Sequence, residues 1–171
     1  LLEIVSEPDM RSVEEARAYG DALRALLRYL EVNSGDMQKG VLRFEANVSV
    51  RPVGEEAFRT RTEIKNLNSF RALERSMAFE IKRQSELHER GERVIQQTMG
   101  WDEKRQVTVS QRSKEEEDDY RYFPEPDLPP LVVEQAWVDE IRAALPELPQ
   151  EKFARFISHY GLSEYDADIL V

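Results

Sequence analysis

The stretch Leu42–Lys65, LRFEANVSVRPVGEEAFRTRTEIK, decides how this chain folds. From Leu42 to Arg51 apolar and polar side chains alternate almost without a break, which is typical of a half-buried strand. After a turn at Pro52–Gly54 the alternation resumes over Arg59–Lys65, so the sequence predicts a long two-stranded hairpin. Its first strand has an apolar face of Leu42, Phe44, Ala46, Val48 and Val50, and a polar face of Arg43, Glu45, Asn47, Ser49 and Arg51.

The polar face of this hairpin has two possible interpretations. On the second strand Arg59, Arg61, Glu63 and Lys65 share one face, as the alternation requires. A solvated sheet face is the simpler interpretation. Carboxylates, amides and guanidiniums on neighbouring strands can instead hold a metal ion and phosphates. The alternation alone leaves both interpretations open.

The composition limits the possible classes of protein. With 171 residues, 40% of them apolar, the chain can bury one core and a small second unit. It has no cysteine, which excludes disulfides and Cys-based zinc sites. It also lacks an apolar run long enough to span a membrane. The net charge of −10 argues against a broad nucleic-acid-coating surface, although it permits a local basic patch.

Two elements are predicted before the hairpin. Leu1–Val5 has the composition of a buried strand, with Glu3 in its middle, where a carboxylate is unfavourable unless it is paired or binds a cation. Ser12 and Glu15 have the spacing of a capping box, and apolar residues at helical spacing follow as far as Leu30. Because the sequence begins in a strand-like stretch and ends in a helical pattern, we expect it to be an internal segment of a longer protein.

A second helix is predicted after the hairpin. Asn68 or Ser69 is placed to cap it, and it should run to about Arg90. Asn66 and Asn68 either bind a ligand at this strand-to-helix turn or only form the turn and the cap. The predicted buried stripe of the helix comprises Phe70, Leu73, Met77 and Ile81.

The remaining segments complete the predicted domains. Two strands are expected at Val94–Met99 and Gln106–Ser110, around a turn at Gly100–Asp102. The aromatic cluster Tyr120–Phe123, followed by prolines, predicts a stiff extended segment that packs on its own domain or contacts a ligand or nucleic acid. Short helices with their own caps follow, so we predict a boundary near Pro129–Val132. The helical stretches are Val133–Leu145, Gln150–Tyr160 and a third that opens at Ser163.

Several long stretches of the chain, in order, resemble one known family. They are LLEIVSEPDMRS, LRFEANVSVRP, TRTEIKNLNSF and GWDEKRQVTVSQRSKEEEDDYRYFPEPDLPPL. Together with the helical tail they resemble GatB, the B subunit of the tRNA-dependent amidotransferase. The resemblance implies an α+β fold with a mostly antiparallel sheet. Residues 1–130 would be the C-terminal portion of a catalytic cradle similar to glutamine synthetase and guanido kinases, and residues 131–171 the start of a truncated all-helical domain.

The resemblance also implies a function. GatB-like proteins are cytoplasmic ATP-dependent carbon–nitrogen ligases of translation, active in a complex with the amidase subunit GatA and the small subunit GatC. They amidate misacylated Glu-tRNA(Gln), Asp-tRNA(Asn) or both, and no membrane is involved. ATP, with Mg²⁺, activates the side-chain carboxylate as an acyl phosphate. Ammonia released from glutamine in GatA then displaces the phosphate.

The family's site residues are expected at matching positions of this chain. Phosphoryl transfer to a carboxylate brings anions together, so Mg²⁺ and basic side chains must offset their charge. The acidic positions that match are Glu3, Glu45 and Glu63, which we expect to act in catalysis as Mg²⁺ ligands; the family more often has Asp at position 45. The residues expected to bind substrate or phosphate are Arg43, Asn47, Ser49, Arg61, Lys65, Asn66, Asn68 and Arg112.

Two further functions compete with this one. The chain could be a tRNA-docking and subunit-assembly module without chemistry of its own, in which case it would never hydrolyse ATP. It could also be a stand-alone carboxylate–amine ligase of the glutamine synthetase type, which would amidate free glutamate without tRNA.

Overall fold

A computed structural model of the chain describes residues 2–113 and 126–171, with only the backbone of residues 112 and 113. It divides into two compact units, residues 1–120 and 121–171, and each unit is described by itself. This division lies upstream of the boundary expected near Pro129–Val132, and that boundary stays a prediction. The expected aromatic segment Tyr120–Phe123 lies outside the described residues.

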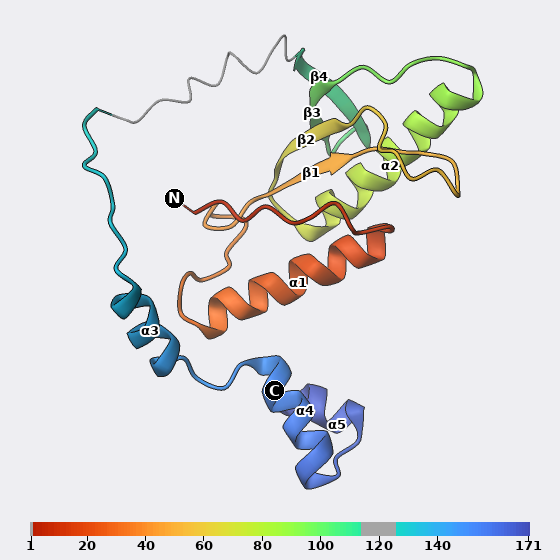
Figure 1. Cartoon of the computed structure of the whole chain (residues 1–171). Helices are drawn as coiled ribbons and strands as arrows, with labels where there is room; N and C mark the ends of the chain where they lie inside the picture. The colour runs from red at the N-terminus through yellow and green to blue at the C-terminus, as the bar shows by residue number, and fades with distance from the viewer. Residues whose placement is uncertain (1, 114–125) are drawn as a thin grey trace. The chain divides into compact units, whose positions relative to one another are not determined.

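The first unit is built on a four-stranded mixed sheet in the order β1-β2-β3-β4 (Figure 1). The strands are β1 (Phe44–Val48), β2 (Thr62–Leu67), β3 (Gln97–Asp102) and β4 (Val107–Ser113). The predicted hairpin is confirmed, because β1 and β2 pair antiparallel with Asn47 opposite Glu63. β3 and β4 are also antiparallel, whereas β2 and β3 are parallel. That parallel pair needs a crossover, and the helix α2 (Phe70–Glu89) supplies it.

The helix α2 begins where the sequence predicts. Ser69 is its N-cap, and the Ser69 hydroxyl accepts a hydrogen bond from the backbone N–H of Ala72 at 3.1 Å. The predicted buried stripe is wrong at its end, because Ile81 is 37% exposed while Glu80 and Gln84 are fully buried. This part of the helix faces two threonines of the sheet, Thr62 and Thr108. Their buried hydroxyls need an acceptor, which the carboxylate of Glu80 provides and an alkyl side chain could not.

The hydrophobic core lies between α2 and the apolar face of the sheet. Its buried members on these elements are Ala46, Val48, Ile64, Leu67, Phe70, Ala72, Leu73 and Met77. The first helix, α1 (Val13–Tyr29), packs along α2 and is capped by Ser12 as predicted. A Cβ on Gly20 of α1 would lie 2.8 Å from the Phe70 ring, so the glycine permits this close packing of the two helices.

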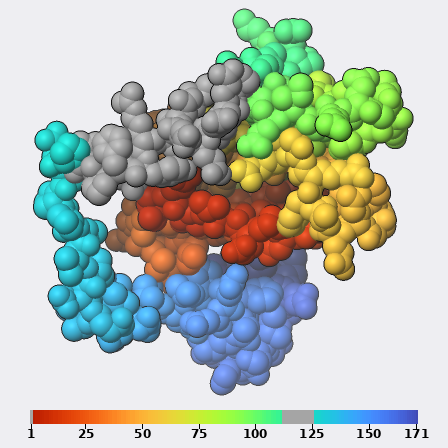
Figure 2. All heavy atoms as spheres, turned by 45° about the horizontal axis from the view of Figure 1, so that its top comes forward, coloured from red at the N-terminus to blue at the C-terminus, as the bar shows by residue number. Residues whose placement is uncertain are grey.

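The predicted strand Leu1–Val5 is wrong for the described part of the segment. Residues 2–7 form neither helix, strand nor turn, a turn follows at residues 8 and 9, and Leu2 and Val5 are 71% and 81% exposed. Figure 2 shows this N-terminal segment, in red, at the surface. The sheet of the described residues pairs none of its strands with the segment, so its apolar side chains have no sheet to pack in.

The predicted turn at Gly100–Asp102 is also wrong, because these residues belong to β3. The turn follows them at residues 103–106, where the Asp102 carboxylate accepts hydrogen bonds from the N–H groups of Lys104 and Arg105, both at 3.0 Å. Gly100 instead pairs with Val109 of β4, and the Gln111 side chain lies over it, since a Cβ on Gly100 would come within 2.4 Å of the Gln111 amide.

The second unit contains three helices in its described residues: α3 (Gln135–Ala144), α4 (Pro149–Tyr160) and α5 (Glu164–Leu170). Gly161, at φ 65°, ends α4, and Ser163 caps α5 as predicted. Apolar residues at helical spacing in α4 predict an inward face of Phe153, Phe156, Ile157 and Tyr160, but none of these four residues is fully buried, and Tyr160 is 65% exposed. Among all described residues, no helix is long and apolar enough to cross a membrane.

Candidate functional site

The candidate site is the face of the sheet that points away from α2. Ala46, Val48 and Ile64 are buried in the core, so the residues that alternate with them point to the opposite side. The parallel pairing of β2 and β3 adds Thr98 beside Glu63. We call this surface the polar sheet face; its members are Glu45, Asn47, Glu63, Lys65 and Thr98.

Two carboxylates on this face share one ammonium group. Lys65 Nζ lies 3.2 Å from Glu45 Oε2 and 3.4 Å from Glu63 Oε1. Partial burial opposes the charge of Lys65, but the hydrogen bond to Glu45 and the charges of Glu45 and Glu63 outweigh it and raise the pKa of Lys65. Lys65 is therefore a cation at neutral pH, held between two anions.

The two carboxylates differ in how firmly they are held. The side chain of Glu63 is 15% exposed, and its Oε2 accepts a hydrogen bond from Thr98 Oγ1 at 3.1 Å. The side chain of Glu45 is 43% exposed, and it contacts Lys65. Glu63 therefore has a fixed orientation, whereas Glu45 has room to turn toward a ligand or water.

The expected trio of metal ligands is not assembled in the described residues. Glu45 and Glu63 come together through Lys65, but Glu3 lies in the exposed N-terminal segment. No group of three acidic, histidine or cysteine side chains in the described residues could hold a metal ion. The pair Glu45 and Glu63 still fits Mg²⁺ in donor type, because this ion often binds through one or two carboxylates and completes its shell with water and phosphate.

The residues expected to bind phosphate around the hairpin have separate positions. Asn47 is exposed on the polar sheet face, opposite Glu63. Arg43 and Arg61 are exposed and directly precede β1 and β2. Ser49 is engaged within the hairpin, since its hydroxyl donates to the Arg59 carbonyl at 2.9 Å. This contact gives Ser49 a structural role at the base of the hairpin loop.

Asn66 has a structural role that the sequence did not indicate. The pairing of β1 and β2 shifts between Phe44 and Ala46, and Asn66 adopts φ 60° in this bulge. Ile64 and Leu67 are both fully buried although three positions separate them, which strict alternation forbids. The left-handed backbone of Asn66 restores the alignment, and asparagine tolerates this conformation better than most residues.

The last two expected residues lie on other elements. Asn68 is exposed just before the cap of α2 and lines a pocket there. Arg112 lies on β4 opposite Thr98 in the register, so its backbone belongs to the row of Asn47, Glu63 and Thr98 across the sheet. Its side chain is outside the described part of the structure.

A buried carboxylate beneath the site was missed by the sequence analysis. Glu80 accepts hydrogen bonds from Thr62 Oγ1 at 2.7 Å, Thr108 Oγ1 at 3.1 Å and Gln84 Nε2 at 3.0 Å, and it pairs with Arg83. Burial alone would raise the pKa of Glu80, but hydrogen bonds from Arg83, Thr62 and Gln84 lower it. Since Thr62 directly precedes Glu63, this network anchors the strand that carries the site.

The comparison with known proteins agrees with this architecture. Residues 1–139 match the family described as the GatB/GatE catalytic domain. The chain belongs to that family. The predicted resemblance to GatB is therefore confirmed, and the polar sheet face lies within the matched residues.

Three relatives illustrate this similarity and its extent. Each is named as the B subunit of an aspartyl/glutamyl-tRNA(Asn/Gln) amidotransferase. The proteins from Carboxydothermus hydrogenoformans, Herpetosiphon aurantiacus and Halorhodospira halophila are 56%, 57% and 59% identical over 170 residues. The match covers 99% of this chain but only 35%, 35% and 36% of these relatives. The chain thus spans about a third of their length.

Proposed function

We propose that the polar sheet face is part of the site where a GatB-like protein activates and amidates the side-chain carboxylate of a misacylated tRNA. The carrying observation is the cluster of Glu45, Glu63 and Lys65 in a chain of the GatB/GatE catalytic-domain family. Two carboxylates and one ammonium on rigid strands suit a reaction that gathers phosphates and a metal ion. ATP and Mg²⁺ are the proposed cofactors.

The proposed reaction has two steps. A carboxylate oxygen of the aminoacyl group attacks the γ-phosphorus of ATP, and ADP leaves. Ammonia then attacks the acyl carbon. The bond between this carbon and the bridging oxygen breaks, and the oxygen leaves as part of inorganic phosphate. Bound Mg²⁺ would supply positive charge to the phosphates.

The residues of this chain would act by position and charge. Glu63 and Glu45 would provide the carboxylate oxygens that hold Mg²⁺ and its water. Lys65, which is protonated, would offset the charge of the transferred phosphoryl group. Asn47, from its exposed place opposite Glu63, would orient a ligand water or a phosphate oxygen. The expected roles of Arg43, Arg61 and Arg112 in phosphate binding remain proposals.

The substrates and partners are proposed from the relatives. Their name specifies aspartyl and glutamyl tRNA(Asn/Gln) and describes one subunit of an amidotransferase. We therefore propose Glu-tRNA(Gln), Asp-tRNA(Asn) or both as substrates, and GatA and GatC as partners, with ammonia released from glutamine in GatA. The test is an assay of the full-length protein in complex with both partners, with each misacylated tRNA, ATP and glutamine.

Glu63→Gln is the variant that tests the site itself. An amide is a poorer Mg²⁺ ligand than a carboxylate, and weaker binding of the ion leaves the phosphate charge uncompensated. We therefore expect acyl-phosphate formation to fall by about a thousandfold, as for loss of a key electrostatic group. Glutamine hydrolysis by the partner subunit should persist. Glu92→Gln, which removes an exposed carboxylate paired with Arg90, is the matched control and should retain activity. Acyl-phosphate formation at the unaltered rate in Glu63→Gln would show that the polar sheet face takes no part in the reaction.

A docking and assembly module is the alternative, and one observation favours it for the second unit. Trp137, Ile141 and Leu145 are 50%, 50% and 46% exposed at helical spacing along and just after α3. A chain with only this role would bind misacylated tRNA equally well after Glu63→Gln and would support no ATP hydrolysis. Amidation of free glutamate without tRNA would instead identify the stand-alone ligase.

A further inference from the structure

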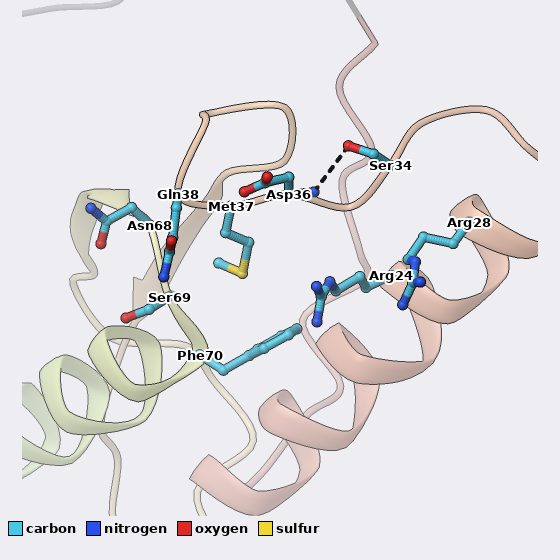
Figure 3. A pocket seen from close by; sticks show the side chains of 9 residues that line it. All are labelled: Arg24, Arg28, Ser34, Asp36, Met37, Gln38, Asn68, Ser69 and Phe70. Carbon is cyan, nitrogen blue, oxygen red and sulfur yellow. Dashed lines mark hydrogen bonds between the residues drawn. The ribbon is translucent and has the colours of Figure 1, made fainter.

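A second polar site is an open pocket of about 470 Å³ at the start of α2 (Figure 3). Three segments line it: α1, the loop after α1, and the start of α2. Met37 and Phe70, which are 7% and 8% exposed, supply its apolar side chains. The polar lining residues are Arg24, Arg28, Ser34, Asp36, Gln38, Asn68 and Ser69.

Two arginine side chains converge on one side of this pocket. Arg24 Nε donates to the Gly35 carbonyl at 2.8 Å, which fixes the guanidinium. A Cβ on Gly35 would lie 2.9 Å from Arg24 Cγ and 2.9 Å from Arg28 Cδ, so both side chains pack against the bare Cα of this glycine. Gly35 also adopts φ 66°, which favours glycine. The loop is therefore shaped to hold two positive side chains next to each other.

The carboxylate in the pocket is engaged elsewhere. Asp36 Oδ1 accepts a hydrogen bond from the Lys39 backbone at 3.1 Å, and Asp36 Oδ2 lies 3.4 Å from Lys39 Nζ. The backbone hydrogen bond from Lys39 is the largest cause that lowers the pKa of Asp36. Within the described residues no ion pair joins Arg24 or Arg28 to a carboxylate. Two adjacent guanidiniums repel each other, and an anion between them would relieve that repulsion.

We propose that this pocket binds a phosphate group through Arg24 and Arg28. Guanidiniums match phosphate oxygens in geometry and charge, and Figure 3 shows Arg24 and Arg28 next to each other on α1, while the side-chain ends of Asn68 and Ser69 are directed away from them. The phosphate belongs to a nucleotide or to an RNA strand, since both present the same group. The site is separate from the polar sheet face and does not depend on the chemistry proposed there.

Binding measurements on the full-length protein in its complex test this site. The variants are Arg28→Gln and Arg24→Gln, with Arg90→Gln as a control that removes an exposed arginine paired with Glu92. The probes are tRNA by filter binding at several salt concentrations, and ATP and inorganic pyrophosphate by equilibrium dialysis. Arg28→Gln is the decisive variant, because Arg28 makes no side-chain hydrogen bond in the described structure and its loss should leave the fold intact. Thermal unfolding followed by circular dichroism checks that this variant is folded.

The expected result is that each pocket variant weakens one probe by about tenfold, the size of one charge-assisted hydrogen bond, while Arg90→Gln does not. Weaker tRNA binding, with a salt slope reduced by about one, would assign the pocket to an RNA phosphate. Weaker ATP and pyrophosphate binding with unchanged tRNA affinity would assign it to a nucleotide. Unchanged affinity for every probe in folded Arg28→Gln would overturn the proposal, whereas failure of the Glu63→Gln test would leave it standing.

Discussion

At the scale of single residues, the side chain that sets the candidate site is Glu63. Its two oxygens have different partners, Lys65 on one and Thr98 on the other. A carboxylate held on both sides keeps one orientation, which is what a metal-binding or phosphate-facing group needs. Glu45 lies across the same ammonium but is far more exposed. The two carboxylates therefore differ in how firmly they are held, and Glu63 is the one that neighbouring side chains fix in place.

The contribution of Thr98 can be measured separately from that of Glu63. Thr98→Val keeps the shape of the side chain and removes the hydroxyl, so Glu63 Oε2 loses a hydrogen bond. We expect acyl-phosphate formation by the full-length complex to fall by about tenfold, which corresponds to roughly 1.4 kcal/mol. Thr98→Ser should restore most of the rate, because it restores the donor.

The control for this prediction is Thr60→Val, since Thr60 is exposed and lies outside β2. A purely structural role for Thr98 would predict equal losses in Thr98→Val and Thr98→Ser, together with a lowered midpoint of thermal unfolding. Equal rates in all three variants would show that Thr98 does not position Glu63.

At the scale of elements, α2 joins the core to the site through a carboxylate. Glu80 reaches β2 through Thr62 and β4 through Thr108, so one helix residue connects two strands that are not neighbours in the sheet. The network is buried, and every partner of Glu80 in it donates a hydrogen bond. A buried carboxylate so surrounded stabilises one register of the sheet, because a slipped strand would leave the charge unsatisfied.

The pH dependence of unfolding should reveal this network. The folded-state pKa of Glu80 is depressed, so its contribution is present above the unfolded-state pKa of about 4.3 and is lost as pH falls through the folded-state value. We expect Glu80→Gln to lower the free energy of unfolding by about 1–3 kcal/mol at neutral pH. The difference from the unaltered chain should shrink below about pH 4.

Urea denaturation between pH 3 and pH 7 measures this difference. Glu86→Gln, on the exposed side of the same helix, is the matched control, and it should stay within about 0.5 kcal/mol of the unaltered chain. A destabilisation in Glu80→Gln that does not change with pH would mean that lost packing, and not the ionised carboxylate, accounts for the effect.

Sequence patterns predicted the elements that rest on local chemistry. The hairpin, the caps at Ser12 and Ser69 and the position of Glu45 and Glu63 on one sheet face all follow from alternation or from short-range hydrogen bonds. The failures concern long-range partners. Ile81 fits an apolar stripe, but two threonines from distant strands require a carboxylate nearby, at Glu80.

Two other failures also concern long-range partners, one present and one missing from the described residues. The stretch Gly100–Asp102 has the composition of a turn, yet Gln111 from the neighbouring strand fills the space above Gly100. The N-terminal stretch with Glu3 has the composition of a strand, yet in the described structure no strand pairs with it. In the first case the deciding contact comes from a part of the chain that local composition does not report, and in the second case no partner strand exists among the described residues.

At the scale of the whole molecule, the net charge of −10 opposes the approach of nucleic acid. The chain carries 34 acidic residues against 24 basic ones, and its isoelectric point is about 4.9. Long-range repulsion of this kind acts on any polyanion, whatever its sequence. A phosphate pocket such as that of Arg24 and Arg28 acts only at short range, so it can add affinity to a complex that other surfaces bring together.

This contrast gives a prediction for the 171-residue chain alone. At pH 7 and about 0.1 M salt we expect it to retain no bulk tRNA on a filter at micromolar protein, because repulsion between the two polyanions is only partly screened over a Debye length of about 10 Å. Below the isoelectric point the carboxylates become protonated and the net charge turns positive. Retention should then appear and weaken with added salt, since nonspecific binding depends on released counterions. Tight, salt-sensitive binding at pH 7 would contradict this and would require a basic surface far stronger than the pair of arginines. Arg28→Gln, measured at both pH values, would then report whether the pocket is part of that surface.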